Sequence, residues 1–214
     1  MRTAIISLSL LALVGCTAIP ADPPPSWQAR SNHYLLSGRQ GWMPGRHLRF
    51  GPYQVSVDTK APFNLLDDVL LKSRHQSVTI DLTDNAGDSA RLHYEQRCDG
   101  HHGDLTIVEP HKFAAHIEAQ GLLATFNDPY NLTLNGQHYH LDYALNAQPK
   151  VISISLNRRG FAELHLGVFD GSFSVKDHVW LVNDLAKSDA VIGALLVGYA
   201  VTFRPDYCNE SVNQ

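Results

Sequence analysis

Apolar and polar residues alternate with a period of two along most of the chain beyond residue 30. The stretch 78–83 reads VTIDLT, and the same alternation recurs at 130–134, 138–145, 151–156 and 163–168. Because successive side chains of a β-strand point to opposite faces, this period indicates strands with one buried and one solvated face. We predict about ten to twelve short strands in a mainly antiparallel β fold, either a sandwich or an open barrel.

Turn-forming residues separate these alternating stretches. Asn135-Gly136 lies between two of them and favours a two-residue hairpin, because both residues tolerate positive φ. Further turn signals occur at 84–87, 127–129, 159–160 and 170–171. Short connections of this kind predict that strands adjacent in sequence pair antiparallel.

One or two short helices interrupt the strand pattern. Asn64 is a suitable N-cap for a helix over about 65–72. Ser188 opens a second helix over about 189–202, although its β-branched residues also suit a buried strand. The apolar run 190–203 is too short to span a bilayer and is predicted to be buried core.

The composition is that of a globular protein. The 214 residues are 44% hydrophobic and 18% charged, with a formal net charge of −4. This length allows one β-rich domain over residues 30–214. No basic cluster exceeds the pair Arg158-Arg159, so the sequence excludes nucleic acid as an expected partner.

Residues 1–15 have the features of a secretory signal peptide: Arg2 precedes an apolar stretch over 5–14. The stretch ends in Leu13-Val14-Gly15-Cys16, which resembles the lipobox of bacterial lipoproteins. The resemblance implies cleavage before Cys16, a diacylglyceryl thioether on its sulfur, and an acyl chain such as palmitate on its amino group.

The residues after Cys16 bear on where such a lipoprotein resides. In this class an Asp directly after the lipidated cysteine resembles an inner-membrane retention signal, and the chain has Thr17 there. The resemblance therefore implies a lipid anchor in the outer membrane, on the periplasmic face. Residues 16–29 are rich in proline and form a tether, extended at about 3.1 Å per residue in polyproline II segments.

Two cysteines remain if Cys16 carries lipid. In an oxidising compartment Cys98 and Cys208 are expected to form a disulfide, which closes a loop of roughly 100 residues and contributes about 4–5 kcal/mol in the chain-entropy model. The alternative is a pair of unbonded, buried thiols.

His138, His140 and Asp142 are the clearest candidate metal ligands. Alternate residues of a strand share a face, so these three side chains lie together. The alternative is that they are the solvated face of a half-buried strand. Because a zinc site needs at least three converging protein ligands and no further pair is spaced to complete it, we expect neither a bound metal nor another cofactor.

A second His-rich stretch follows Cys98, with His101-His102 and, further on, Glu109 and His111. It matches no zinc signature and also suits an exposed loop. The chain lacks the G-x-S-x-G nucleophile motif and phosphate-binding glycine loops. We therefore assign no catalytic residue and favour a role other than catalysis.

We expect an outer-membrane lipoprotein whose β-rich domain acts as a binding or envelope-structural module, with another envelope protein as partner. One alternative is a carrier of lipid or another small hydrophobic ligand, since residues 34–42 loosely resemble the opening of outer-membrane lipoprotein chaperones. The other is a metal-binding protein or hydrolase that uses His138, His140 and Asp142. A pocket between the sheets favours the carrier, and a fourth ligand near the three side chains favours the metal site.

Overall fold

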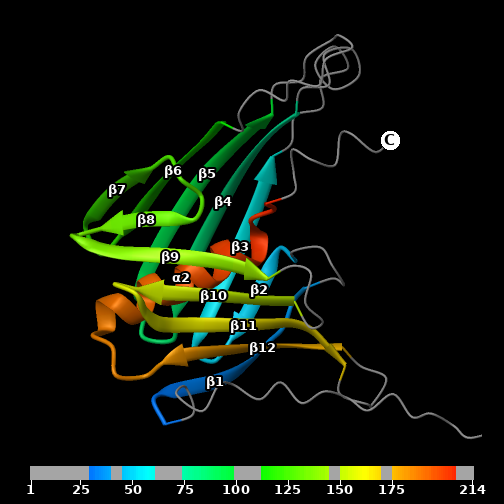
Figure 1. Ribbon diagram of the computed structural model, residues 1–214, viewed down its shortest axis with the longest axis vertical. Helices are drawn as coiled ribbons and strands as arrows, with labels where there is room; N and C mark the ends of the chain where they lie inside the picture. Colours follow the sequence, from blue (N-terminus) through cyan, green and yellow to red (C-terminus); the bar gives the residue numbers. More distant parts are fainter. Residues whose placement is uncertain are drawn as a thin grey trace, which may run out of the picture.

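A computed structural model of the chain describes residues 29–39, 45–60, 74–98, 112–144, 150–169 and 175–205. These residues form twelve strands in two six-stranded antiparallel sheets and one helix, labelled α2 (Figure 1). The prediction of a mainly β, antiparallel fold with a short helix is confirmed, and its form is a sandwich of two sheets.

The first sheet, sheet A, has the strand order β1-β12-β11-β10-β9-β8, so the first and last strands of the fold pair with each other. Its strands are β1 (Ser31–Leu36), β8 (Asn131–Leu134), β9 (Gln137–Ala144), β10 (Lys150–Leu156), β11 (Arg159–Phe169) and β12 (Val175–Val182).

The second sheet, sheet B, is a meander in which β2 to β7 pair in sequence order. Its strands are β2 (His47–Phe50), β3 (Tyr53–Lys60), β4 (Arg74–Asp84), β5 (Ser89–Cys98), β6 (Lys112–Ala119) and β7 (Leu122–Phe126). The sheets meet just after β1, where the backbones of Ser37 and Arg49 exchange hydrogen bonds of 2.9 and 3.0 Å.

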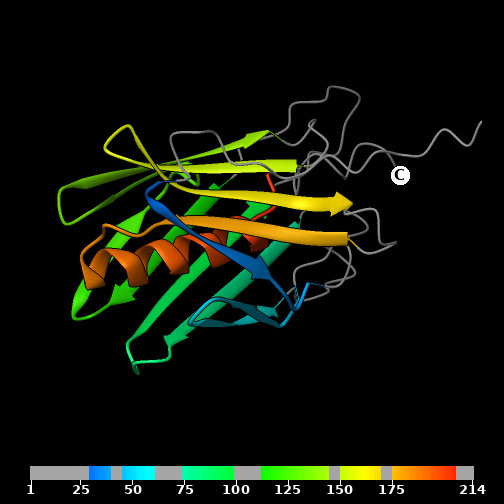
Figure 2. The same ribbon diagram turned by 90° about the horizontal axis from the view of Figure 1, so that it is seen from below.

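Helix α2 (Lys187–Thr202) lies between the two sheets (Figure 2). Every residue from Val191 to Thr202 is buried. The ring of Phe161 on sheet A lies against Gly193, and Val55 on sheet B lies against Gly198. A helix that is apolar on all sides fits this position, because both of its faces pack against the inner surface of a sheet.

The strands overlap the predicted stretches at β4, β8, β9, β10 and β11. Asn135 and Gly136 have φ of 49° and 75° and connect β8 to β9, which confirms the hairpin. The turn predicted at 159–160 is wrong by two residues, because Asn157 and Arg158 form it with φ of 48° and 66°. Asparagine adopts positive φ more readily than most residues, so the turn forms there.

Several predicted features lie outside the described residues: the signal peptide and most of the tether, the helix over 65–72, the turn at 170–171 and Cys208. Helix α2 is buried rather than membrane-spanning, as predicted for the run 190–203. Among the described segments, none is a helix with the length and apolar character needed to cross a bilayer.

Candidate functional site

The three predicted side chains on β9 share one face, as the alternation indicated. His138, His140 and Asp142 are exposed, while the intervening Tyr139 and Leu141 are each 1% exposed and belong to the core. The histidines line an open hollow over β8 to β10 together with Asn131, Thr133 and Arg158.

Hydrogen bonds within the hairpin orient both histidine rings. Asp128 Oδ2 accepts a 2.8 Å bond from Asn131 Nδ2, which directs Asn131 Oδ1 toward His140 Nδ1 at 2.8 Å. His140 therefore carries its proton on Nδ1 when neutral and presents Nε2 to solvent. His138 Nδ1 lies 3.0 Å from Thr133 Oγ1. The rings are held in place, but within the described part of the chain no three His, Cys, Asp or Glu side chains are arranged to hold a metal ion.

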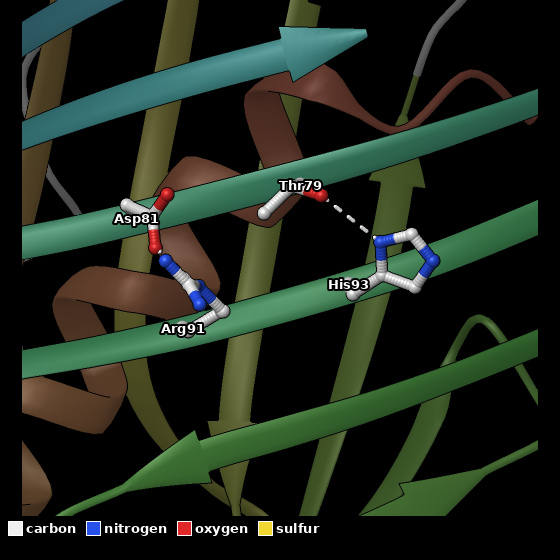
Figure 3. A network of polar contacts seen from close by, with 4 residues as sticks. All are labelled: Thr79, Asp81, Arg91 and His93. Carbon is white, nitrogen blue, oxygen red and sulfur yellow. Dashed lines mark hydrogen bonds and ion pairs between the residues drawn. The ribbon is translucent and has the colours of Figure 1, made fainter. Parts of the chain in front are cut away.

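The outer face of sheet B carries a separate set of polar contacts, shown in Figure 3 with α2 behind the strands. Arg91 Nε on β5 donates to Asp81 Oδ1 on β4 at 2.5 Å, and Thr79 Oγ1 lies 3.0 Å from His93 Nδ1. The Asp81 and Arg91 side chains are about half exposed. Ion pairs this exposed to water contribute little to stability, so we regard this face as ordinary solvated sheet surface.

A third group, which we call the His–Trp cluster, lies on sheet A and consists of His33, Glu163, His165, His178 and Trp180. The strand register brings it together from β1, β11 and β12. One row across the sheet runs from Glu163 through Trp180 to His33. In the adjacent row His165 pairs with His178. His33 and His178, which are 145 positions apart in sequence, thus become neighbours on one face.

Strands β11 and β12 are buried on both faces around the His–Trp cluster, whereas His33 on β1 is exposed. On the inner face, Leu164 and Val179 are fully buried in the hydrophobic core. On the outer face, Glu163, His165 and Trp180 are only 8%, 9% and 3% exposed. Ionisable side chains are rarely buried to this extent unless they have partners, so their contacts define the site.

Two of the histidines contact each other directly. His33 Nε2 and His178 Nδ1 are 2.8 Å apart, and the planes of the two rings are 3° from parallel. His33 also stacks on Trp180 with a centroid distance of 4.8 Å. A hydrogen bond between two ring nitrogens needs a proton on one and a lone pair on the other, so the contact depends on protonation state.

The other half of the His–Trp cluster is a carboxylate–imidazole pair. His165 Nε2 lies 2.7 Å from Glu163 Oε1, and the edge of the His165 ring faces Trp180 at a centroid distance of 4.7 Å. Since an ionised Glu163 only accepts, Nε2 carries the proton of a neutral His165 ring and Nδ1 carries a lone pair. That Nδ1 is buried and has no hydrogen-bond partner within the described residues.

Partial desolvation lowers the pKa of both His33 and His178 below the ordinary histidine value. A proton on His33 or His165 would lower the pKa of His178 further, as does the charge of Lys176, whereas Asp177 opposes them. Both rings of the contact therefore favour the neutral form more strongly than a histidine in water does.

A buried ion pair borders the His–Trp cluster. The guanidinium of Arg39, in the segment after β1, lies 2.8 Å from Asp177 Oδ1, and both side chains are nearly buried. The same carboxylate oxygen accepts a 2.7 Å bond from the backbone N–H of Gly167, which has φ of 78° at an irregularity of β11. These bonds fix β12 against β11 beside His178.

The His–Trp cluster was not predictable from the sequence, because its members come from three strands and share no local spacing. Glu163 and His165 alternate with Leu164 and Leu166, which is also the pattern of a strand with one solvated face. The sequence therefore contains no sign that these two polar side chains are buried. The His-rich stretch 99–111 lies outside the described residues.

Cys98 ends β5 and is buried at 6% exposure. Its predicted partner Cys208 lies outside the described residues, so the disulfide stays a prediction.

No protein family, no curated protein and no solved structure gives a significant match to the chain.

Proposed function

We propose that the chain is an outer-membrane-anchored periplasmic lipoprotein whose β domain acts as a binding or envelope-structural module through its outer surface. The observation that favours a module over a carrier is the position of α2. The helix occupies the space between the sheets, with its glycines against both of them. The clustered ionisable side chains lie instead on outer strand faces, in the His–Trp cluster and on β9.

The position of β1 agrees with an N-terminal anchor. β1 begins at Ser31, directly after the predicted tether, and is an edge strand of sheet A. Arg30 joins this strand to the β10–β11 turn, since its guanidinium donates to the Gly160 carbonyl at 3.2 Å. A tether over 16–29 would therefore pull on an edge strand rather than on the core.

Lipidation is tested by metabolic labelling with a palmitate analogue. The wild-type chain is expected to be labelled and to fractionate with outer membranes, and Cys16→Ser is expected to lose both properties. A Cys16→Ser chain that still labels and still fractionates with membranes contradicts the proposal. Thr17→Asp serves as a matched variant, because it should keep the label and move the chain to the inner membrane.

The disulfide expected for an exported protein has support near the end of α2. Gln96 on β5 donates through Nε2 to the carbonyl of Arg204, at a distance of 3.4 Å. Cys98 lies two residues beyond Gln96 on the same strand face, and Cys208 lies four residues beyond Arg204. Mass spectrometry of the unreduced protein should find both cysteines in one linked peptide pair. Two free thiols in the unreduced protein would contradict the predicted disulfide.

The carrier alternative is separated from the module by a hydrophobic probe. The full chain is expected to show no saturable enhancement of N-phenyl-1-naphthylamine fluorescence, because α2 fills the core between the sheets. Saturable one-to-one binding favours the carrier.

The metal alternative is tested by elemental analysis of untagged protein. Stoichiometric zinc or copper that is lost in His138→Ala/His140→Ala supports this alternative.

A further inference from the structure

We propose that His33 and His178 form a proton-binding site that releases the edge strand β1 from sheet A at mildly acidic pH. The site lies outside the helix-filled core and involves neither the β9 histidines nor the cysteines.

The contact itself sets how many protons the pair can hold. His33 Nε2 and His178 Nδ1 are 2.8 Å apart, and a hydrogen bond at this distance uses one proton and one lone pair. A first added proton leaves an imidazolium donating to a neutral ring, so the bond persists. A second added proton removes the remaining lone pair and places two like charges on stacked rings. Full protonation is therefore incompatible with the docked arrangement.

The groups around the pair do not offset that charge. Trp180 stacks on both rings, at centroid distances of 4.8 Å from His33 and 5.7 Å from His178. On β11, the carboxylate of Glu163 is already engaged with His165. The remaining charged groups are on β12 and after β1: Lys176 adds positive charge, and Asp177 is paired with Arg39.

The sign of the effect follows from the contact and from desolvation. Docking of β1 places the two rings against each other and partly desolvates them, although the His33 side chain stays exposed, and this lowers their pKa relative to a released strand in solvent. The released state therefore binds more protons than the docked state as the pH falls below the ordinary histidine value of about 6.5. Docking is fully favoured above that pH and weakens below it.

β1 is the strand that this site controls. It pairs with β12 over its six residues, and its other edge has no partner strand among the described residues. Across this pairing, His33 lies opposite Trp180 and Leu35 lies opposite His178. If the chain is anchored as proposed above, release of Ser31–Leu36 lengthens the tether by about 20 Å. The release itself does not depend on the anchor.

The test is hydrogen–deuterium exchange of the full chain at pH 7.5 and pH 5.0, with each rate divided by the intrinsic rate at that pH. For each proton that only the released state binds, the docking equilibrium changes tenfold per pH unit. We expect the corrected exchange of residues 31–36 to rise about tenfold or more at pH 5.0, while exchange of β4 and β5 stays within about twofold.

His33→Phe is the informative variant, because phenylalanine keeps the stack on Trp180 and cannot take up a proton. It should reduce the pH response of the corrected exchange of β1 and leave only the part that comes from desolvation of His178. His138→Phe is the matched control on β9, where the histidine is exposed and bonded to Thr133, and it should keep the wild-type response. Equal corrected exchange of β1 at both pH values in wild type, or a pH response in His33→Phe as large as that of wild type, overturns the proposal.

His33→Phe could also fail to dock at either pH, and NMR titration of the wild-type imidazole Cε1 protons then decides. Resonances of His33 and His178 that titrate below the other histidines, together with broadening of β1 amides over the same pH range, support the site. Titration of both rings at the ordinary histidine value overturns it. Palmitate labelling tests the anchor separately, so the two proposals fail independently.

Discussion

The outer faces of the two sheets differ in a way that their sequences do not reveal. On sheet B, β5 and β6 alternate strictly between buried and solvent-facing residues, and the ion pair Arg91–Asp81 is about half exposed. On sheet A, Glu163 and His165 of β11 alternate with apolar residues in the same way in sequence, yet both are buried on the outer face, as is Trp180 of β12.

This difference determines what the polar groups can do. On sheet B each polar side chain can exchange its partner for water, so pairing contributes little to the free energy of unfolding. On sheet A burial weakens that exchange, and each ionisable group depends on a specific neighbour or on its own protonation state. The His–Trp cluster is therefore where the chain is expected to be sensitive to substitution and to pH.

The largest expected effect is the loss of Trp180. Trp180→Ala should lower the free energy of unfolding by about 3–5 kcal/mol, because the indole is 3% exposed and contacts three histidines. Leu123→Ala on β7, where the side chain is 79% exposed, should change it by less than about 0.5 kcal/mol. Urea titration measures both. Similar losses in the two variants would show that the outer face of sheet A is not a packed layer.

The second comparison is between one polar pair on each sheet. His165→Leu should cost about 3 kcal/mol, since it leaves Glu163 buried without its 2.7 Å partner. Arg91→Leu should cost no more than about 1 kcal/mol, because Asp81 remains in contact with water. Thermal unfolding at neutral pH provides the measurement. Equal costs would contradict the contrast between the two faces.

The helix glycines extend the comparison to the inner faces. A methyl group on Gly193 would lie 2.6 Å from two atoms of the Phe161 ring on sheet A, so Gly193→Ala should cost about 1–3 kcal/mol. On Gly198 the nearest atom would be Val55 Cγ1 on sheet B, at 3.1 Å. There the gain in helix propensity of about 1 kcal/mol offsets the tighter contact, so Gly198→Ala should be nearly neutral. The denaturant midpoints of the two variants measure these costs. A larger loss in Gly198→Ala than in Gly193→Ala would contradict the placement of the helix.

The smallest expected effect is a pH dependence of global stability. The native state lowers the pKa of His33 and His178, so the unfolded chain binds more protons below about pH 6.5. The free energy of unfolding should therefore fall from pH 7 toward pH 5. His33→Phe/His178→Phe should flatten this slope, and His93→Gln/His116→Gln on sheet B should leave it in place. If the slope is unchanged in His33→Phe/His178→Phe and disappears in His93→Gln/His116→Gln, the pH dependence comes from sheet B and this prediction is wrong.

Local patterns predicted much of the fold. Alternation located five strands, and Asn135-Gly136 located a hairpin, because both signals depend only on neighbouring residues. The error of two residues at the β10–β11 turn has a local cause as well, since Asn157 competes with Gly160 for the positive-φ position and Asn157 forms the turn.

The β9 face was predictable for the same reason. His138, His140 and Asp142 share a strand and alternate, so their common face follows from strand geometry. Their hydrogen bonds to Thr133 and Asn131 were not predictable, because they depend on the register between β8 and β9.

By itself the sequence determined the strand period, the hairpin at Asn135-Gly136 and the apolar character of the stretch that becomes α2, since each depends on residues close together in the chain. Only the tertiary structure decided that this stretch is a helix between two sheets, because its β-branched residues suit a strand until packing on both sides is known. The tertiary structure also decided the His–Trp cluster. Burial and strand register are properties of the assembled sheet, and no local pattern shows that His33 and His178 lie 2.8 Å apart.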